Sequence, residues 1–406
     1  MVRCIGVLPV GVAGPAIGLA WRSSGDDASA RPVLHSRAVQ IDAAVLRAVN
    51  APLSVESVEL AAPRAGEVLI EMKAAGVCHS DWHCVTGDSE IDLPAVLGHE
   101  GSGVVRRLGP GVENLGVGDH VALSWIPACG VCVECVRDRR HLCQTHLRNL
   151  WAGLMLDGTR RMTDTAGEPL FHLAAISTWA THSVVPAISC VRMPDVPFEI
   201  SALIGCGVTT GVGAVLNKAG ILPGMSVAVF GAGGVGLSTV MGAVVARADP
   251  IIVVDRAQEK EVIARSFGAT DVVITDDLVA AVDAIRTATG GRGADVVFDA
   301  VGLASIEAHL LRALAPAGMA VLVGIPASGT RFDVEASEFI RQEKVLTGSI
   351  FGSADTARDF VRYAELYRQG RLPLDRLVTG RYRLDEINDA CAAMLSGSAG
   401  RSVIVF

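Results

Sequence analysis

The chain has 406 residues, of which 44 are glycine, 50% are hydrophobic and 19% are charged. This composition supplies a large core and, at about 100 to 200 residues per domain, predicts about two or three domains. The 35 basic and 43 acidic side chains give a net charge of −8, and only 4% of residues are aromatic. We therefore expect no nucleic-acid partner, since phosphate backbones would be repelled and few rings are available for base stacking.

Eight of the ten cysteines fall between Cys78 and Cys206. A disulfide framework would spread its cysteines along the chain, so this bunching favours metal ligation in a reducing compartment. We accordingly expect a cytoplasmic protein.

Residues 1–38 differ from the rest of the chain. The uncharged run from Cys4 to Trp21 follows Arg3, as in a signal peptide, but Pro9 and Pro15 disfavour a helix there. We interpret this segment as an extension or a mis-assigned start, and a targeting segment is the alternative. No later run has the roughly 18 uninterrupted apolar residues of a membrane span, so we expect no membrane partner.

In the rest of the chain the pattern of hydrophobic and polar residues changes once. Short alternating apolar segments from Val39 onward, such as residues 67–72 and 101–107, predict a twisted and mostly antiparallel barrel. After Gly207, apolar strands alternate with helical stretches, which predicts a doubly wound parallel sheet covered on both faces. These strands are expected at residues 226–230, 251–255, 271–274, 295–299 and 319–324. The α/β chain thus divides into 39–207 (first part of one domain), 208–350 (the parallel-sheet domain) and 351–406 (the return to the first), ending in a strand at 402–406.

A glycine-rich turn follows the first of those strands. Residues 231–236 read Gly-Ala-Gly-Gly-Val-Gly and precede a helix expected at 237–247. In this pattern Gly231 permits a tight turn, Gly233 lets a pyrophosphate approach the backbone, and Gly236 lets helix and strand pack closely. Asp255 ends the next strand, 19 residues later, where its carboxylate can accept hydrogen bonds from the adenosine ribose. The turn predicts NAD as the cofactor, although Arg256 leaves NADP open.

Four cysteines lie close together in sequence, at Cys129, Cys132, Cys135 and Cys143. Four thiolates at this spacing can close a tetrahedral shell, which predicts a structural zinc. A ferredoxin-type cluster would place the fourth cysteine sooner and usually before proline, whereas Gln144 follows here.

Three other segments carry metal-ligating residues. They are Gly-Val-Cys-His-Ser-Asp-Trp-His at 76–83, Gly-His-Glu-Gly at 98–101 and Gly-Cys-Gly-Val-Thr-Thr-Gly at 205–211. A catalytic zinc needs three protein ligands and an open position, and Cys78, His99 and Cys206 would provide them. Each residue alone is more often a core side chain.

In their order and spacing, these motifs resemble the zinc-dependent medium-chain alcohol dehydrogenases over residues 39–406. Residues 154–159 and the strand leading to Val185 resemble the animal-type long form, which includes the glutathione-dependent formaldehyde dehydrogenases. The resemblance implies a GroES-like catalytic barrel, a Rossmann domain, NAD and two zinc ions per chain. It also implies reversible oxidation of a small apolar primary alcohol, or an aryl or secondary one, to its aldehyde or ketone.

The resemblance assigns catalytic roles on these residues. An alkoxide would form on the zinc held by Cys78, His99 and Cys206, and its proton would pass through Ser80 and the nicotinamide ribose to His83. Asp81 would orient His99, and Glu100 would lie behind the metal. The resemblance also implies cofactor contacts: His79 and Arg401 with the pyrophosphate, Lys260 with the adenosine ribose, Thr210 and Val235 with the nicotinamide, and Gly234 in the cofactor turn. It places Trp125 and Leu173 in the substrate pocket.

Two alternatives remain open. A thiol-adduct formaldehyde dehydrogenase would use an acidic pair, for which Asp88 and Glu90 are candidates, and an arginine where Leu147 stands, with Arg148 one residue late. A non-catalytic NAD- and zinc-binding homologue is the alternative from another class.

For assembly, residues 319–324 resemble the edge strand through which family members pair their nucleotide domains, which implies a homodimer or homotetramer.

Overall fold

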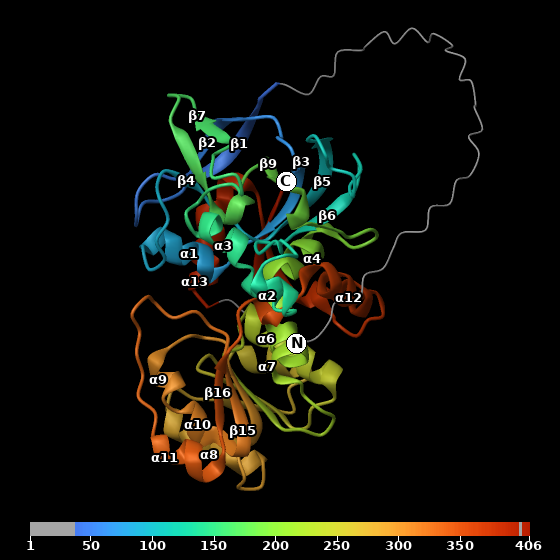
Figure 1. The fold of residues 1–406 in the computed structure, drawn as a ribbon. Helices are drawn as coiled ribbons and strands as arrows, with labels where there is room; N and C mark the ends of the chain where they lie inside the picture. Colours follow the sequence, from blue (N-terminus) through green and yellow to red (C-terminus); the bar gives the residue numbers. More distant parts are fainter. Residues whose placement is uncertain (1–36, 398–399) are drawn as a thin grey trace, which may run out of the picture. The chain divides into compact units, whose positions relative to one another are not determined.

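The computed structural model describes residues 37–397 and 400–406. Residues 37–406 form one compact unit. The extension expected at 1–38 lies almost entirely outside the described residues. Within the described unit, Figure 1 shows one region built mainly of β-strands and a second region built around a sheet flanked by helices.

The first region begins with a small closed barrel. Its strands, in pairing order, are β1 (Val39–Leu46), β2 (Ser54–Leu60), β7 (Met162–Asp164), β8 (Pro169–His172) and β4 (Ala95–Val96). Alternate residues of β1, among them Ile41, Ala43 and Val45, are buried inside it with Val58 and Leu60. The period of two in these segments is what turns one set of side chains inward.

A larger sheet joins both ends of the chain. It contains β10 (Cys190–Arg192), β6 (His120–Leu123), β5 (Gly101–Leu108), β3 (Glu67–Gly76), β18 (Arg401–Val405) and β17 (Val378–Tyr382), and β9 (His182–Pro186) also pairs with β3. Because β18 pairs antiparallel with β3, placing Val403 opposite Gly76, the C-terminal segment returns to the first region. This return places Arg401 next to residues that lie some 300 positions earlier.

The second region contains a six-stranded parallel sheet. Its order is β13 (Asp271–Ile274), β12 (Ile251–Asp255), β11 (Val227–Phe230), β14 (Ala294–Asp299), β15 (Leu314–Leu322) and β16 (Val345–Gly348). Strand, helix, strand alternation therefore gives the expected doubly wound sheet. One expectation was wrong: β15 is flanked by β14 and β16, so residues 319–324 do not form the edge, which β16 provides instead.

Thirteen α-helices lie among the described residues. They are α1 (His79–Thr86), α2 (Val133–Val136), α3 (Gln144–Trp151), α4 (Phe198–Leu203), α5 (Thr209–Gly213), α6 (Gly234–Ala246), α7 (Lys260–Ser266), α8 (Leu278–Ala288), α9 (Ala304–Glu307), α10 (Leu310–Ala313), α11 (Ala336–Gln342), α12 (Thr356–Arg368) and α13 (Ile387–Leu395). Helix α6 begins at Gly234, three residues before the expected start, because the last glycines of the turn already form its first turn.

One helical run connects the two regions. It spans Phe198–Ala219 through α4, α5 and two π-helical stretches, Ile204–Val208 and Ala214–Ala219. By length and mean hydropathy this run could cross a membrane, although polar residues interrupt it, and 89% of its most apolar window is buried inside the protein. It is therefore a core helix here, and the first π-helical stretch carries Cys206.

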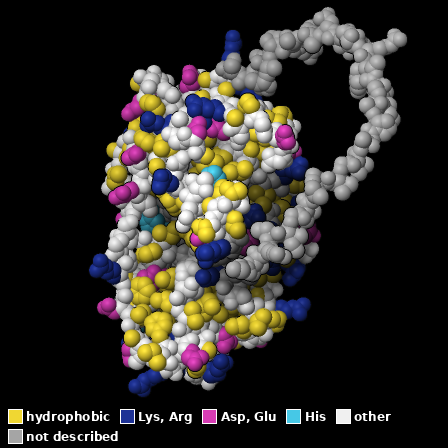
Figure 2. Space-filling view, viewed as in Figure 1, with side chains coloured by type: hydrophobic (Ala, Val, Ile, Leu, Met, Phe, Trp, Pro, Cys, Tyr) yellow, Lys and Arg dark blue, Asp and Glu magenta, His cyan; other side chains and the backbone are white. Residues whose placement is uncertain are grey.

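Charged side chains are mixed on the surface. On the face shown in Figure 2, acidic and basic groups alternate with hydrophobic ones over both regions. That face carries no continuous basic surface of the kind that a nucleic-acid backbone would need.

Candidate functional site

Two thiols, an imidazole and a carboxylate converge in the first region. The ligand atoms of Cys78, His99, Glu100 and Cys206 all lie within 4.8 Å of one another, and all four residues are buried. Cys78 caps α1, His99 and Glu100 directly precede β5, and Cys206 comes from the core helix. We call these four residues the buried donor set; the sequence motifs named three of them as ligands and placed Glu100 behind the metal.

Asp81 orients the imidazole of this set. Its Oδ1 lies 2.8 Å from His99 Nδ1 and also accepts a hydrogen bond from the backbone N–H of Gly98 at 3.1 Å. With Nδ1 held in this way, Nε2 of His99 is the nitrogen that remains for a metal. Burial opposes a charge on His99, but Asp81 outweighs it and holds the pKa of His99 well above its usual value.

The two thiols of the set, Cys78 and Cys206, have pKa values shifted in opposite directions. The side chain of Cys206 donates to Cys78, and together with the nearby Arg401 it holds the pKa of Cys78 well below its usual value despite burial. A thiolate, a second thiol and a free imidazole nitrogen at this spacing suit a soft divalent ion. The donor chemistry of this buried set therefore fits zinc.

Glu100 and Arg401 connect the donor set to the glycine turn. They form a buried ion pair, yet Glu100 Oε2 and Arg401 Nε have no hydrogen-bond partner within the described structure. A Cβ on Gly234, the first residue of α6, would meet the side chain of Arg401. Arg401 was expected at the cofactor pyrophosphate, and its buried, unpartnered Nε beside the turn fits an anion there.

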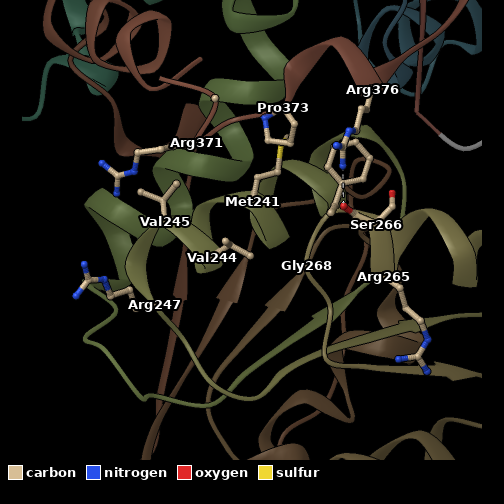
Figure 3. Close-up of a pocket in the computed structure, with 12 residues that line it drawn as sticks. Met241, Val244, Val245, Arg247, Arg265, Ser266, Gly268, Arg371, Pro373 and Arg376 are labelled. Carbon is tan, nitrogen blue, oxygen red and sulfur yellow. Dashed lines mark hydrogen bonds between the residues drawn. The ribbon is translucent and has the colours of Figure 1, made fainter. Parts of the chain in front are cut away.

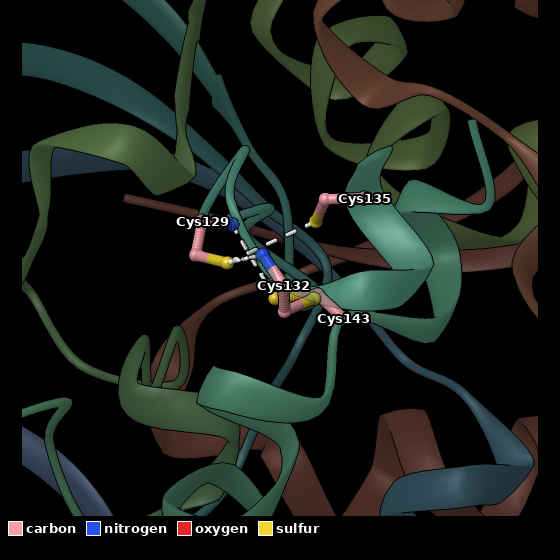
Figure 4. Close-up of side chains that lie close together, drawn as sticks. All are labelled: Cys129, Cys132, Cys135 and Cys143. Carbon is pink, nitrogen blue, oxygen red and sulfur yellow. Dashed lines mark hydrogen bonds between the residues drawn. The ribbon is translucent and has the colours of Figure 1, made fainter. Parts of the chain in front are cut away.

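The four clustered cysteines also converge. Their ligand atoms lie within 4.8 Å of one another, and Figure 4 shows the four side chains turned toward a common centre. Backbone N–H groups of Val131 and Cys132 donate to Cys129 Sγ at 3.4 and 3.3 Å, and that of Cys129 donates to Cys143 Sγ at 3.3 Å. Hydrogen bonds lower the pKa of Cys132 to about 6, the main one from the backbone of Cys135, whereas burial raises the pKa of Cys135 to about 12, so the thiolate form is favoured at Cys132 and not at every position.

The glycine turn has the geometry that a dinucleotide needs. Gly231 has φ +95°, and a Cβ on Gly236 would collide with the carbonyl oxygen of Gly231. A Cβ on Gly233 would meet nothing within 4 Å, so the backbone is open at the position expected to face the pyrophosphate. Asp255 accepts hydrogen bonds from Ala232 N at 2.7 Å and from Lys260 Nζ at 3.4 Å, which brings both residues expected at the adenosine ribose together.

The residues of the expected proton relay lie along α1. Ser80 Oγ is 3.8 Å from Cys78 Sγ, and His83 Nδ1 is 3.4 Å from Asp88 Oδ2. Ser80 and His83 make no direct hydrogen bond with each other in the described structure, so the predicted relay through the nicotinamide ribose stays a prediction. His79, at the start of the same helix, is exposed.

The positions expected at the nicotinamide are also near this set. Thr210 Oγ1 lies 4.0 Å from Cys206 Sγ, and Val235 is half-buried in α6 next to the glycine turn. Both therefore lie on elements that carry the donor set or the cofactor turn.

An aromatic wall adjoins the donor set. The ring centroids of Trp125 and His99 are 6.1 Å apart, those of Trp125 and Phe351 4.9 Å, and those of Trp125 and Trp151 5.9 Å. Sequence reasoning named Trp125 but missed Trp151 and Phe351, because no local pattern links residues so far apart. Leu173, the other expected pocket residue, is buried in the same core cluster as Trp125.

The groups considered for a thiol-adduct site lie in different surroundings. Asp88 pairs with His83, and Glu90 lines a hollow of about 450 Å³ that Trp151 also lines. Leu147 is packed against the core and Arg148 is exposed.

Several cysteines and histidines belong to none of the sequence motifs, and those that the structure describes in this group include buried side chains. Burial raises the pKa values of Cys84 and Cys391 to about 12 and lowers that of His172 to about 3, while Cys190 is also a buried free thiol. Cys4 and His35 lie outside the described residues.

Comparison with known proteins identifies the family. Residues 64–195 match the alcohol dehydrogenase GroES-like domain, and residues 234–366 match the zinc-binding dehydrogenase domain. The chain is 37% identical to the class-3 alcohol dehydrogenase of Cereibacter sphaeroides over 90% of this chain and 99% of that one, and 38% identical to the geraniol dehydrogenase of Castellaniella defragrans over 91% and 98%. The crystal structure of benzyl alcohol dehydrogenase from Acinetobacter calcoaceticus superposes with a TM-score of 0.85 at 32% identity, over 91% of this chain and 99% of that one. The chain therefore belongs to the zinc-dependent medium-chain alcohol dehydrogenases, oxidoreductases with a GroES-like and a Rossmann domain that use zinc and NAD.

Proposed function

We propose that the chain reversibly oxidises an apolar primary alcohol, preferably an aryl or allylic one, to its aldehyde with NAD. The observation that carries this proposal is the wall of Trp125, Trp151 and Phe351 beside His99. Flat aromatic surface next to the donor set favours a substrate with a planar apolar body. Relatives named geraniol dehydrogenase and benzyl alcohol dehydrogenase support the same substrate class.

The residues of the site have separate tasks in this proposal. Zinc held by Cys78, His99 and Cys206 would polarise the alcohol oxygen, and NAD at the glycine turn would accept the hydride. Ser80 would take the proton that the alcohol loses. His83 would return a proton to water, since its side chain is 24% exposed. Asp81 would keep His99 in the tautomer that leaves Nε2 free.

A substrate panel tests the proposal. We expect kcat/KM for benzyl alcohol and geraniol to exceed that for ethanol by at least about tenfold, because each methylene placed in an apolar pocket contributes about 1 to 3 kcal/mol. NADH absorbance at saturating NAD gives the rates. Ethanol as the best substrate would contradict the role of the aromatic wall.

The same panel separates the two alternatives. Highest kcat/KM for the glutathione adduct of formaldehyde would identify a thiol-adduct dehydrogenase. Absence of turnover with every alcohol, in protein that contains two zinc ions per chain, would identify a non-catalytic homologue.

Asp88 should help to position His83, the residue proposed to return a proton to water. Asp88 accepts a hydrogen bond from Thr86 at 2.6 Å and lies 3.4 Å from His83 Nδ1, and these contacts lower the pKa of Asp88, so it is ionised at neutral pH. Asp88→Asn replaces this ionised partner of His83 by a neutral amide. We expect kcat/KM for benzyl alcohol at neutral pH to fall, by less than about fivefold because an exposed ion pair contributes about 0 to 1 kcal/mol.

Asp92→Asn is the matched control for that variant. Asp92 is an exposed carboxylate of the same segment, and no contact with His83 is found for it. Its kcat/KM should equal that of the unmodified enzyme. Equal losses in the two variants would show a general effect of charge and contradict the specific pairing.

A further inference from the structure

A hollow of about 640 Å³ lies apart from both donor sets. It is bounded by α6 and α7 of the parallel-sheet region and by residues 370–376, which follow α12 (Figure 3). Twelve residues line it, and none of them is Asp or Glu. Four are arginines, namely Arg247, Arg265, Arg371 and Arg376. Such a concentration of positive charge is unexpected in a chain whose net charge is −8.

Two of these arginines are already engaged within the protein. Arg265 pairs with Glu261 at 3.1 Å and donates to the carbonyl of Thr270 at 2.9 Å. Arg376 donates to the carbonyl of Ser266 at 3.1 Å. These contacts hold the two side chains along one side of the hollow.

The other two guanidinium groups have no partner among the described residues. Neither Arg247 nor Arg371 has a side-chain hydrogen bond or ion pair with any residue that the structure describes. Figure 3 shows both on the same side of the hollow, with Val245 between them. Both guanidinium groups extend outward on the same side as Val245, so together they can present several N–H donors to one anion at this rim, an arrangement that favours a phosphate.

The helix C-termini near the hollow compensate only part of the positive charge of the four arginines. Arg247 caps α6 and Arg265 lies in the last turn of α7, where a cation compensates the helix dipole. Two helix C-termini carry about half a negative charge each, so after these and Glu261 an excess of about two positive charges remains.

The floor of the hollow is apolar. Met241, Val244 and Val245 come from one face of α6, and Phe267 and Pro373 complete the surface. Val244, in the last turn of α6, is 42% exposed, so its apolar side chain is open to the hollow. An apolar floor beneath a basic rim suits a ligand that joins an anionic group to an apolar body.

We propose that this hollow is a second binding site, for a phosphate monoester with an aromatic or aliphatic body. The phosphate would lie between Arg247 and Arg371, and the body would cover Val244 and Met241. The site is distinct from the glycine turn, since that turn is at the N-terminus of α6 and the hollow is at its C-terminal end, about 20 Å away at 1.5 Å per residue.

The test uses 1-naphthyl phosphate as the probe on the full chain with two zinc ions and saturating NAD. Calorimetric titration should show one saturable site, and 1-naphthol or inorganic phosphate alone should bind at least about tenfold more weakly, because each lacks one half of the recognition. The double variant Arg247→Gln/Arg371→Gln should weaken binding of the probe at least about tenfold, with unchanged dehydrogenase turnover as the check of folding.

Arg341→Gln is the matched control. Arg341 lies on α11, which packs against β15 away from the hollow, and its exposed side chain has the same charge. Binding of the probe to this variant should equal that of the unmodified protein. Equal weakening in both variants, no weakening in the double variant, or no saturable binding at saturating NAD would overturn the proposal. If the double variant fails to fold, Arg371→Gln alone, in an exposed segment, should still weaken binding.

Discussion

Replacement of Cys206 by serine should reduce dehydrogenase turnover by about a thousandfold or more, equivalent to about 4 kcal/mol in activation free energy. Cys206 is buried in the donor set. Serine is similar in size to cysteine, but its hydroxyl is a weak ligand for a soft metal. The zinc content, measured by elemental analysis, should fall from two ions per chain to one. Affinity for NAD, measured by fluorescence titration, should be retained because the glycine turn is untouched.

Cys190→Ser provides the comparison for this result. Cys190 is also a buried free thiol, but it belongs to neither donor set, and its Sγ contacts only the carbonyl of Pro186 at 3.8 Å. This variant should keep two zinc ions and turn over within a few-fold of the unmodified enzyme. Full turnover by Cys206→Ser with one zinc would contradict the assignment of the donor set.

Replacement of Cys143 by serine should instead lower stability. Cys143 is fully buried, and its thiol accepts a hydrogen bond from Cys129 N as well as contributing to the four-cysteine cluster. A structural zinc contributes directly to folding, so loss of this ion should lower the thermal midpoint by on the order of 10 °C. Scanning calorimetry measures the midpoint, and elemental analysis should again show one zinc per chain.

The control for stability is Cys391→Ser, since Cys391 is 1% exposed and outside both metal sites. It should cost only about 1 to 3 kcal/mol, the usual penalty for a buried hydroxyl without a good partner. The two zinc variants should therefore separate: Cys206→Ser mainly loses turnover, and Cys143→Ser mainly loses stability. Equal thermal midpoints for Cys143→Ser and the unmodified protein would mean that the cluster holds no structural ion.

Local pattern alone was sufficient for the parts of the protein that are contiguous in sequence. The four cysteines between Cys129 and Cys143 and the glycine turn at 231–236 could be recognised because spacing along a short segment limits the distances in space. Strands such as Ile251–Asp255 and Asp271–Ile274 were predicted to the residue, since continuous apolar runs bounded by glycine or polar residues leave little choice.

The buried donor set shows where sequence alone is insufficient. Cys78, His99 and Cys206 could be chosen only by resemblance to a family, because each is an ordinary core residue by itself. Their ligand atoms meet because α1, the strand β5 and the core helix converge. The prediction that residues 319–324 form the edge of the sheet was wrong for a similar reason. The place of β15 in the sheet depends on β16, which is separated from β15 in the sequence by helix α11.

The sequence by itself thus determined the fold class, the glycine turn and the four-cysteine cluster, whereas the residues of the buried donor set came from the family resemblance. Only the tertiary structure decided that Arg401 pairs with Glu100 against the cofactor turn, that Trp151 and Phe351 join Trp125 in one wall, that Asp88 pairs with His83, and that four arginines surround one hollow. These contacts join side chains from separate elements. Periodicity and spacing describe one element at a time, whereas such contacts arise only when the elements pack.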